Sequence, residues 1–377
     1  MGNSVLDGRA SAVISDGIIT KFYTSAAWID GRAEQQLEDI AGWPGVRKIA
    51  AFPDLHPGKF GPIGCAVLAN RIYPQLAGND IGCGMSLFQL DLPVRRLKLD
   101  KALRRLRALG VPTDHSNGAR LEEAGLAPDL FADALGTIGG GNHFCEVQQL
   151  DDADAQVGLD KTRLYLLVHA GSRGFGNAVL GALRTGAFAG LAADSESARA
   201  YIRDHDRAVL WARLNRQIIA ERAAEALRAE LQLVVDAPHN LIEETAQGWL
   251  HRKGAAIAAR DYVPLAGSRA SASYLLAPAG HGDALGSLAH GAGRRYDRSS
   301  MHGRVRAKKS DLEAMQQTPF GGRILCEDRD LLVEEAPLAY KSAQSVAEDL
   351  HRTGAADCVA RFHPLITFKK VREGGPR

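Results

Sequence analysis

The pattern of apolar and polar positions divides the 377-residue chain into strand-rich and helix-rich blocks. Short apolar or β-branched runs between turn residues predict strands at 12–24 (AVISDGIITKFYT), 45–58 (GVRKIAAFPDLHPG) and 85–94 (MSLFQLDLPV). The run TRLYLLVHAGSRG (162–174) predicts a buried strand that ends in a glycine turn. LDKALRRLRALG (99–110) predicts a helix that ends at Gly110.

A helical pattern extends from about residue 192 to residue 233. Apolar residues recur there every three or four positions, Glu and Arg fill the opposite face, and no Gly or Pro interrupts the run. This predicts one long helix or two consecutive helices. A shorter helix is expected around 343–351, and HPLITFKK (363–370) predicts a strand.

The order of these blocks indicates the fold class. Because strand blocks and helix blocks segregate more than they alternate, an α+β fold is favoured over a doubly wound sheet. We expect central mixed or antiparallel β-sheets that pack together and are flanked by helices. No linker separates the blocks, which predicts one compact domain over 1–377.

Composition narrows the class of protein. With 45% hydrophobic and 24% charged residues, the chain is typical of soluble enzymes. A net charge of only +2 excludes a global basic field, so nucleic-acid binding would need a local basic patch. The start MGNSVLDGRA has no signal-peptide pattern, and no apolar run approaches the roughly 20 residues of a membrane helix. Five scattered cysteines argue against a disulfide framework, so we expect a cytoplasmic protein without membrane contact.

Glycines cluster beside histidines in five motifs. The first, GNDIGCGMS, places a carboxylate and a thiol, Asp80 and Cys83, three residues apart, where both can face one ion. The others are GTIGGGNHFCE with His143, LVHAGSRGFGN with His169, APHNLIEE with His239, and SLAHGAGRR with His290. Each motif alone also has a structural interpretation, such as a tight turn, a core histidine or a buried cysteine.

The combination of these motifs points to chemistry. Asp, Cys and three His supply enough oxygen, sulfur and nitrogen ligands for one or two ions, and imidazole and thiolate favour Mn, Fe, Co or Zn over Mg. Glycine-turn amides and arginines such as Arg173 suit phosphate oxygens. The basic triplet HRK (251–253) suits a polyanion, although such runs are usually solvated. The residues therefore indicate a metal-dependent enzyme acting on phosphate esters, with a fourth histidine left over.

These motifs also resemble a known family. In order along the chain, PDLHPGKFGPIGC, NDIGCGM, GTIGGGNHFCE, HAGSRGFGN, HNLIEE, HRKGA, LAGSRASASYL, AHGAGRR and EEAPLAYK are similar to the motif series of the RtcB-type RNA-splicing ligases. The similarity runs from about Val46 to Lys369. It implies an enzyme that joins an RNA 2′,3′-cyclic phosphate or 3′-phosphate end to a 5′-hydroxyl end. Such enzymes use GTP and Mn²⁺, for which Co, Zn or Fe are substitutes, and pass through a covalent histidine–GMP.

The resemblance implies a role for each matching position. The metal ligands would be Asp80, Cys83, His143, His169 and His239. His290 would be the nucleophile that takes the GMP. The residues around the nucleotide would be Asn142, Glu146, Ser268, Gly291, Ala292, Gly293, Arg294, Tyr340 and Lys369, the last two at the guanine. The candidates for RNA phosphates are Arg173, Arg252, Lys253 and Arg295.

Some positions depart from the family pattern. HAGSRG stands where HSGSRG is usual, and AGSRASASY stands where PGSMGTASY is usual, with Arg269 gained. We expect this change to reshape the loop at 266–271 over the nucleotide. Lys370 replaces a glycine, and the chain is shorter than typical members. These features suggest the shorter branch encoded beside a release-factor-like protein and associated with RNA repair, so that protein or another activating protein is an expected partner.

Two alternatives stay open on sequence grounds. One is a relative that only guanylylates RNA ends or hydrolyses cyclic phosphates without sealing. The other is a non-enzymatic RNA- or ribosome-binding factor on the same scaffold. A binding-only protein has no chemical need for all the proposed ligands together with His290, which argues against the second alternative.

Overall fold

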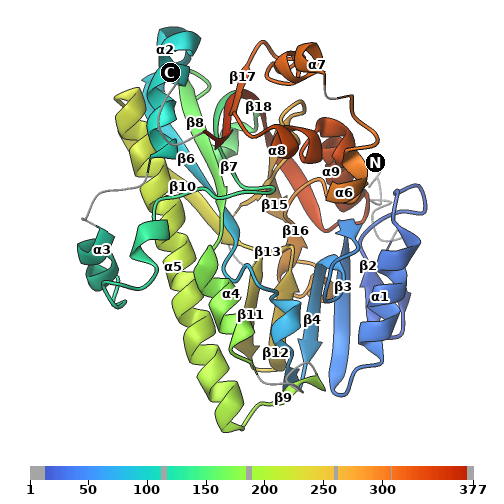
Figure 1. The fold of residues 1–377 in the computed structure, drawn as a ribbon. Coiled ribbons are helices and arrows are strands. Elements are labelled where there is room, and N and C mark those ends of the chain that lie inside the picture. Colours follow the sequence, from blue (N-terminus) through green and yellow to red (C-terminus); the bar gives the residue numbers. More distant parts are fainter. Residues whose placement is uncertain (1–12, 112–116, 184–188, 259–261, 307, 372–377) are drawn as a thin grey trace.

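Two β-sheets hold most of the strands of the computed structural model, which describes residues 13–111, 117–183, 189–258, 262–306 and 308–371 (Figure 1). The first sheet has the strand order β1 (Ile14–Asp16), β2 (Ile19–Lys21), β3 (Val46–His56), β4 (Ile63–Ala69), β12 (Gly248–Lys253) and β11 (Asn240–Thr245). All its neighbours are antiparallel except β2 and β3. The N-terminal strands predicted at 12–24 and 45–58 are thus confirmed, apart from residue 12, which lies outside the described residues.

The second sheet is larger and carries the long C-terminal strand. Its order is β10 (Leu231–Pro238), β6 (Gly84–Pro93), β8 (Arg163–Ala170), β7 (Phe144–Ala153), β18 (Ala356–Lys370), β15 (Ser273–Pro278) and β14 (Val263–Leu265), and β17 (Arg323–Cys326) pairs with β18 in parallel. Two short pairs complete the strands, β13 (Ala255–Ile257) with β16 (Ser287–Ala289) and β5 (Arg71–Ile72) with β9 (Leu191–Ala192). The predicted mixed, largely antiparallel sheets are confirmed.

A shared apolar core joins the two sheets. Phe52 of β3 and Leu250 of β12 belong to one buried cluster with Val263 of β14 and Leu276 of β15. Burial of such side chains stabilises the packing by roughly 1.5–3 kcal/mol each. The expected packing of sheet against sheet is therefore present, whereas the single-domain organisation stays a prediction.

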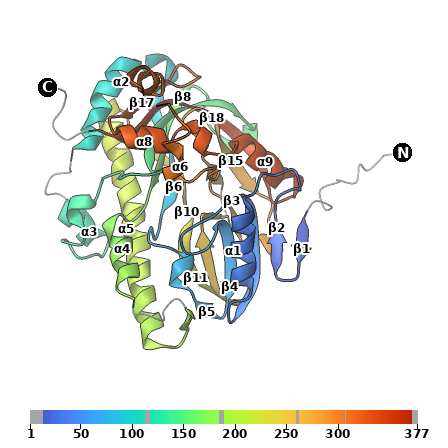
Figure 2. The same cartoon turned by 45° about the vertical axis from the view of Figure 1, so that its right-hand side comes forward.

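Helices flank the sheets, and α1, α2, α5 and α9 pack directly on their strands. They are α1 (Gly31–Ala41), α2 (Leu99–Leu106), α3 (Asn117–Glu123), α4 (Gly174–Gly181), α5 (Glu196–Leu227), α6 (Arg298–Met301), α7 (Lys309–Ala314), α8 (Arg329–Glu334) and α9 (Ala343–Arg352). Figure 2 shows α1 beside the first sheet and α5 beside the second, whereas α9 contacts β3 of the first sheet as well as β15 and β18 of the second. None of the described helices is long and apolar enough to cross a bilayer.

The long helix α5 confirms the predicted helical segment but is shorter than 192–233. Ser195 caps its start by accepting a hydrogen bond from the backbone of Ala198. Arg228, in a left-handed conformation with φ of 60°, ends it. Residues 231–233 belong to β10 instead, because Leu231 and Leu233 pair with β6 of the second sheet.

The strand directions bring distant turns to one edge of the second sheet. Gly84, the first residue of β6, pairs with Ala170 at the end of β8 and with Pro238 at the end of β10. The start of β7 lies there too, since Phe144 pairs with His169. Antiparallel pairing therefore gathers the turns around residues 80–83, 140–143, 169–173 and 238–240.

Candidate metal and nucleotide site

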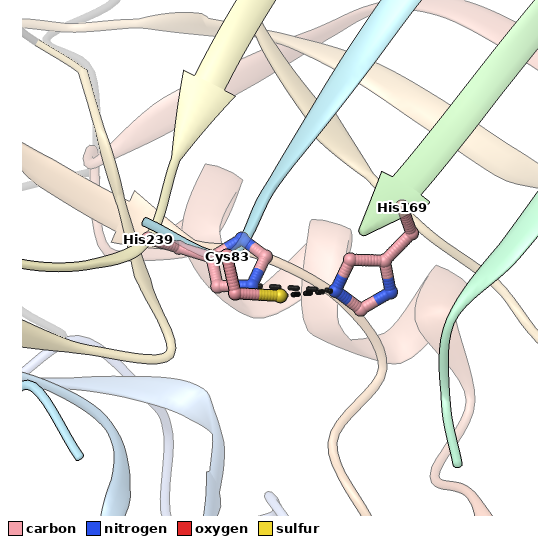
Figure 3. Close-up of side chains that lie close together, drawn as sticks. All are labelled: Cys83, His169 and His239. Atoms are coloured by element: carbon pink, nitrogen blue, oxygen red, sulfur yellow. Dashed lines mark hydrogen bonds between the residues drawn. The ribbon is translucent and has the colours of Figure 1, made fainter. Parts of the chain in front are cut away.

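Five predicted ligands meet at this edge of the sheet. Nε2 of His143 lies 2.9 Å from Oδ2 of Asp80 and 3.3 Å from Sγ of Cys83. Nε2 of His169 lies 3.2 Å from the same Sγ and 3.3 Å from Nε2 of His239 (Figure 3). The side chains come from four separate segments, so the convergence is a product of the fold.

These residues fit transition-metal ions. They form two sets, Cys83 with His169 and His239, and Asp80 with Cys83 and His143, and within each set the ligand atoms lie within 4.8 Å of one another. Burial and the neighbouring imidazoles hold the pKa of His169 and of His239 well below the usual value, which keeps both rings in the neutral form that binds metal. Cys83 belongs to both sets, so the five residues together could hold one or two ions.

A buried arginine lies directly behind the cluster. Nη1 of Arg216 on α5 donates to the carbonyl oxygens of Gly82 (2.8 Å) and Ala170 (3.1 Å), the neighbours of Cys83 and His169 in sequence. Its guanidinium also makes two bonds to Asp236 on β10, at 2.8 and 3.0 Å. Arg216 thus connects the backbone segments that carry three of the ligands.

The preceding residue on α5, Asn215, holds the glycine-rich loop. Oδ1 of Asn215 accepts from the backbone of Gly136 at 2.7 Å, and its Nδ2 donates to the carbonyl oxygens of Thr137 and Gly171, both at 3.2 Å. Glycine is required at position 139, where φ is +95° and a Cβ atom would overlap the guanidinium of Arg173. The glycines of this loop therefore admit an arginine side chain beside the cluster.

His290 faces the same cavity from a different element. It follows β16, and its ring centroid lies 4.4 Å from that of His239. Nδ1 lies 2.7 Å from the carbonyl oxygen of Gly254 and 2.8 Å from Oδ2 of Asp54. Both of these atoms are acceptors, so Nδ1 carries the proton, and the neutral ring has its lone pair on Nε2.

A buried carboxylate organises the residues predicted at the guanine. Glu335 lies 3.0 Å from Nη1 of Arg294 and 3.5 Å from Nζ of Lys369, and it accepts a hydrogen bond from the hydroxyl of Tyr340. Nε of Arg298 lies 3.3 Å from it. Burial alone would raise the pKa of Glu335, but the charges of Lys369 and Arg294 outweigh it and lower the pKa to about 2.

Glu146 has the opposite electrostatic character. Its carboxylate accepts hydrogen bonds from Gln148 at 2.7 Å and from Thr367. Burial nevertheless raises its pKa to about 7, because those bonds and the nearby charge of Lys369 offset the loss of hydration only in part. Glu146 is therefore poised to change charge near neutral pH.

One cavity of about 780 Å³ connects these groups. It is lined by all the predicted metal ligands and nucleotide residues and by three of the four phosphate candidates, namely Asp80, Cys83, Asn142, His143, Glu146, His169, Arg173, His239, Lys253, Ser268, His290, Gly291, Ala292, Gly293, Arg294, Arg295, Tyr340 and Lys369. Such a volume is typical of sites for drug-sized ligands and cofactors.

Arg252 does not line this cavity, and its assignment to RNA phosphate is corrected. The guanidinium is buried, forms an ion pair with Glu243 on β11 and donates to the hydroxyl of Ser287 at 2.8 Å. Its neighbour Lys253 points to the other face of β12 and does line the cavity, where Nζ donates to the carbonyl oxygen of Gln75 at 2.9 Å. Burial lowers the pKa of Lys253 to about 8.

The altered loop at 266–271 is held inward by its new arginine. Arg269 is buried, lines the cavity, and donates from Nη2 to the carbonyl oxygen of Leu332 on α8 at 2.9 Å. Within the loop, the backbone of Ser268 donates to the hydroxyl of Ser271 at 2.7 Å. The substitution thus anchors the loop to α8.

Three residues that organise the site, Asp54, Glu335 and Arg216, were not among the residues predicted from the sequence. Asp54 lies within the motif PDLHPG and Glu335 within EEAPLAYK, so the resemblance to the family pattern already included both positions. Arg216 interrupts the apolar face of α5 between Ala212 and Ile219, and a charged residue at such a position indicates a buried partner. The partners themselves come from distant segments.

The mixed sheets with flanking helices and the buried His, Cys and Asp donor sets define an α+β protein with a site that could hold metal ions. A family model described as tRNA-splicing ligase RtcB matches residues 36–127 and 125–370. The chain is 41% identical to the RNA-splicing ligase RtcB2 of Escherichia coli over 376 residues, which cover 96% of this chain and 98% of that relative. The chain belongs to the RtcB family of RNA-splicing ligases.

More distant relatives carry the same family name. Identity is 29% to the RNA-splicing ligase RtcB1 of Escherichia coli, with 86% of this chain and 91% of the relative covered. It is 27% to the tRNA-splicing ligase RtcB of Archaeoglobus fulgidus, with 89% and 91% covered. The resemblance found in the sequence motifs is confirmed.

Proposed function

We propose that this chain is a GTP- and Mn²⁺-dependent RNA ligase. It joins RNA 2′,3′-cyclic phosphate or 3′-phosphate ends to 5′-hydroxyl ends through a covalent histidine–GMP and an activated RNA 3′ end. The observation that best supports this proposal is His290, whose Nδ1 is held by two acceptors in the cavity that contains both donor sets. An imidazole with a free Nε2 is the form that can attack phosphorus.

His290 carries the first step. Its Nε2 forms a bond to the α-phosphorus of GTP while the bond to pyrophosphate breaks. The ring gains positive charge as it does so, and Asp54, at 2.8 Å from Nδ1, stabilises that charge and fixes the ring. Gly291, Gly293 and Arg294 line the cavity next to His290, and we assign them to the phosphates of the nucleotide.

Transfer to RNA completes the cycle. An oxygen of the RNA 3′-phosphate takes the GMP from Nε2, and His290 returns to its neutral form. The 5′-hydroxyl then attacks the 3′-phosphorus, and GMP leaves. The proton of the hydroxyl passes to solvent or to a neighbouring base. A cyclic phosphate is opened by water before this sequence begins.

The metal ions would be held by Asp80, Cys83, His143, His169 and His239, and when bound they supply positive charge that stabilises phosphate oxygens and polarises phosphorus. The donor set suits Mn²⁺, with Co, Zn or Fe as substitutes. Around the nucleotide we assign Asn142, Glu146, Ser268, Tyr340 and Lys369, and for RNA phosphates Arg173, Lys253 and Arg295. We also propose a cytoplasmic role in RNA repair, with a release-factor-like or activating protein as partner.

Mass measurement after incubation with GTP and Mn²⁺ tests the first step. We expect a GMP adduct that is absent from His290→Ala and present in His302→Ala, a variant of a half-exposed histidine outside the cavity. Adding RNA with a 3′-phosphate and a 5′-hydroxyl then separates sealing from capping or cyclic-phosphate hydrolysis. An adduct that survives His290→Ala would refute the assignment of the nucleophile.

A further inference from the structure

Aromatic and arginine side chains alternate at one side of the cavity. The guanidinium of Arg295 lies 5.5 Å from the ring of Trp28 and 5.5 Å from the ring of Tyr296. The guanidinium of Arg304 lies 4.0 Å from the same Tyr296 ring. Arg295 and Tyr296 line the cavity, so this row, which we name the aromatic rim (Trp28, Arg295, Tyr296, Arg304), begins inside the cavity and continues outside it.

The rim is exposed and carries uncompensated charge. Trp28 is 42% exposed, although indole is among the largest apolar side chains, and Arg295 and Arg304 are exposed as well. Within the described part of the chain, neither of these arginines forms an ion pair, whereas Arg32 nearby is paired with Asp30 at 2.7 Å. An exposed indole beside Arg295, and a tyrosine ring between Arg295 and Arg304, favour an anionic ligand with flat apolar faces.

The backbone holds the rim in a fixed position. The amides of Arg295 and Tyr296 both donate to the carbonyl oxygen of Ala339, at 2.7 and 3.3 Å. Nζ of Lys341 lies 5.7 Å from the ring of Trp28 and donates to the carbonyl oxygen of Leu55 at 2.7 Å. In Figures 1 and 2, α6, which follows Tyr296, lies above α1, which follows Trp28. The backbone that carries Arg295 and Tyr296 is therefore ordered before binding, which lowers the entropic cost of binding.

We propose that the aromatic rim binds the single-stranded end of the RNA substrate. Bases next to the reacting end stack on Trp28 and Tyr296, while Arg295 and Arg304 contact the phosphates between them. This inference rests on the proposed RNA-ligase function and specifies where the RNA strand leaves the cavity. A single strand fits better than a duplex, because only unpaired bases expose their faces to aromatic rings.

RNA binding without GTP tests the rim separately from catalysis. The probe is a fluorescent single-stranded RNA with a 3′-phosphate, and its Kd is measured by anisotropy. We expect Trp28→Ala to raise Kd roughly tenfold, as stacking of about one base predicts, and Trp28→Phe to restore most of the affinity. Phe320→Ala removes an equally exposed aromatic outside the cavity and serves as the matched control.

Two further measurements distinguish stacking from charge. With the unaltered protein, RNA that is abasic at the positions next to its 3′ end should bind about tenfold more weakly, and this difference should disappear in Trp28→Ala. Arg295→Ala should instead reduce the salt dependence of binding by about one unit of slope.

These measurements can show that the rim proposal is wrong independently of whether the proposed ligase function is wrong. If Trp28→Ala and the abasic RNA both leave Kd unchanged, the rim does not bind RNA, even if the protein seals RNA ends. If the protein binds RNA through Trp28 but forms no GMP adduct, the ligase proposal fails and the rim stands. When the sealing of RNA ends is also measured, the sealing rate of each variant is divided by its rate of GMP-adduct formation. This ratio removes any effect of the substitution on the nucleotide site.

Discussion

Nδ1 of His290 lies 2.8 Å from Oδ2 of Asp54, a carboxylate that is fully buried beneath it. The same oxygen lies 3.2 Å from the backbone nitrogen of His290, which donates to it. One carboxylate oxygen thus sets both the position and the tautomer of the imidazole. The relationship joins residues 236 positions apart in sequence.

Replacement of this carboxylate should impair the formation of the GMP adduct. In Asp54→Asn the amide can present its NH₂ group to Nδ1, which favours the tautomer with the proton on Nε2 and removes the nucleophilic lone pair. We expect the rate of adduct formation to fall at least about a hundredfold. The rate is measured by mass spectrometry, with Asp283→Asn, at an exposed carboxylate, as the control. A rate within a few-fold of the unaltered protein would mean that Asp54 does not set the tautomer.

Arg216 should determine how tightly the metal is held. Arg216→Lys keeps the charge but loses the guanidinium that reaches Gly82, Ala170 and Asp236 at once. Loss of such support behind the ligands typically weakens metal binding roughly 10- to 100-fold. Mn²⁺ affinity is measured by competition with a chelating dye, and Arg213→Lys on the exposed face of α5 is the control.

A purely structural role for Arg216 would give a different result. In that case Arg216→Lys would lower the thermal unfolding temperature of the metal-free protein while its Mn²⁺ affinity stayed that of the Arg213→Lys control.

Local sequence predicted which side chains lie together better than it predicted their orientation. The five predicted metal ligands lie beside turns at the ends of strands. Because these strands pair in antiparallel fashion, their turns come together at one edge of the sheet. The sequence of a single strand did not predict which of its side chains face the cavity. Successive side chains of a strand point to opposite faces, so the pairing of β12 with its neighbours decides that Lys253 faces the cavity and Arg252 does not.

Contacts between residues far apart in sequence explain the other features that the sequence did not predict. Leu231 and Leu233 continue the helical pattern, and only their pairing with Leu90 and Phe88 on β6 places them in a strand. Likewise, Glu335 becomes a buried hub because Arg294 and Lys369 come to it from other elements. Neither residue type nor local spacing identifies such partners.

Glu335 should make the stability of the protein depend on pH. Its pKa of about 2 in the folded protein lies below the ordinary value of 4.5, so its contribution is present above pH 4.5 and is lost as the pH falls toward 2. We expect Glu335→Gln to lower the free energy of unfolding by about 3 kcal/mol at pH 7 and by about 2 kcal/mol at pH 3.5.

Chemical denaturation at the two pH values checks this expectation. The matched control is Glu334→Gln, the adjacent and partly exposed carboxylate, which should change the free energy of unfolding by less than about 1 kcal/mol. A loss for Glu335→Gln that is equally large at both pH values would show that packing, and not the paired charge, is responsible.

Glu146 should make nucleotide binding weaken as the solution becomes more acidic. Its pKa of about 7 means that it is a carboxylate above neutral pH and an uncharged acid below it. Only the carboxylate is a pure acceptor, which suits the N–H and O–H donors of a bound nucleotide. We expect the Kd for GTP to rise by up to about tenfold between pH 8 and pH 6, measured by calorimetry.

The variant Glu146→Gln separates this effect from the titration of GTP itself. Its side chain cannot change charge, so any pH dependence that remains in the variant belongs to the phosphates or to other groups of the protein. We expect the variant to bind GTP more weakly than the unaltered protein at pH 8, and the difference to shrink at pH 6, where Glu146 is itself uncharged. An identical pH profile in the two proteins would show that Glu146 keeps one charge state throughout this range.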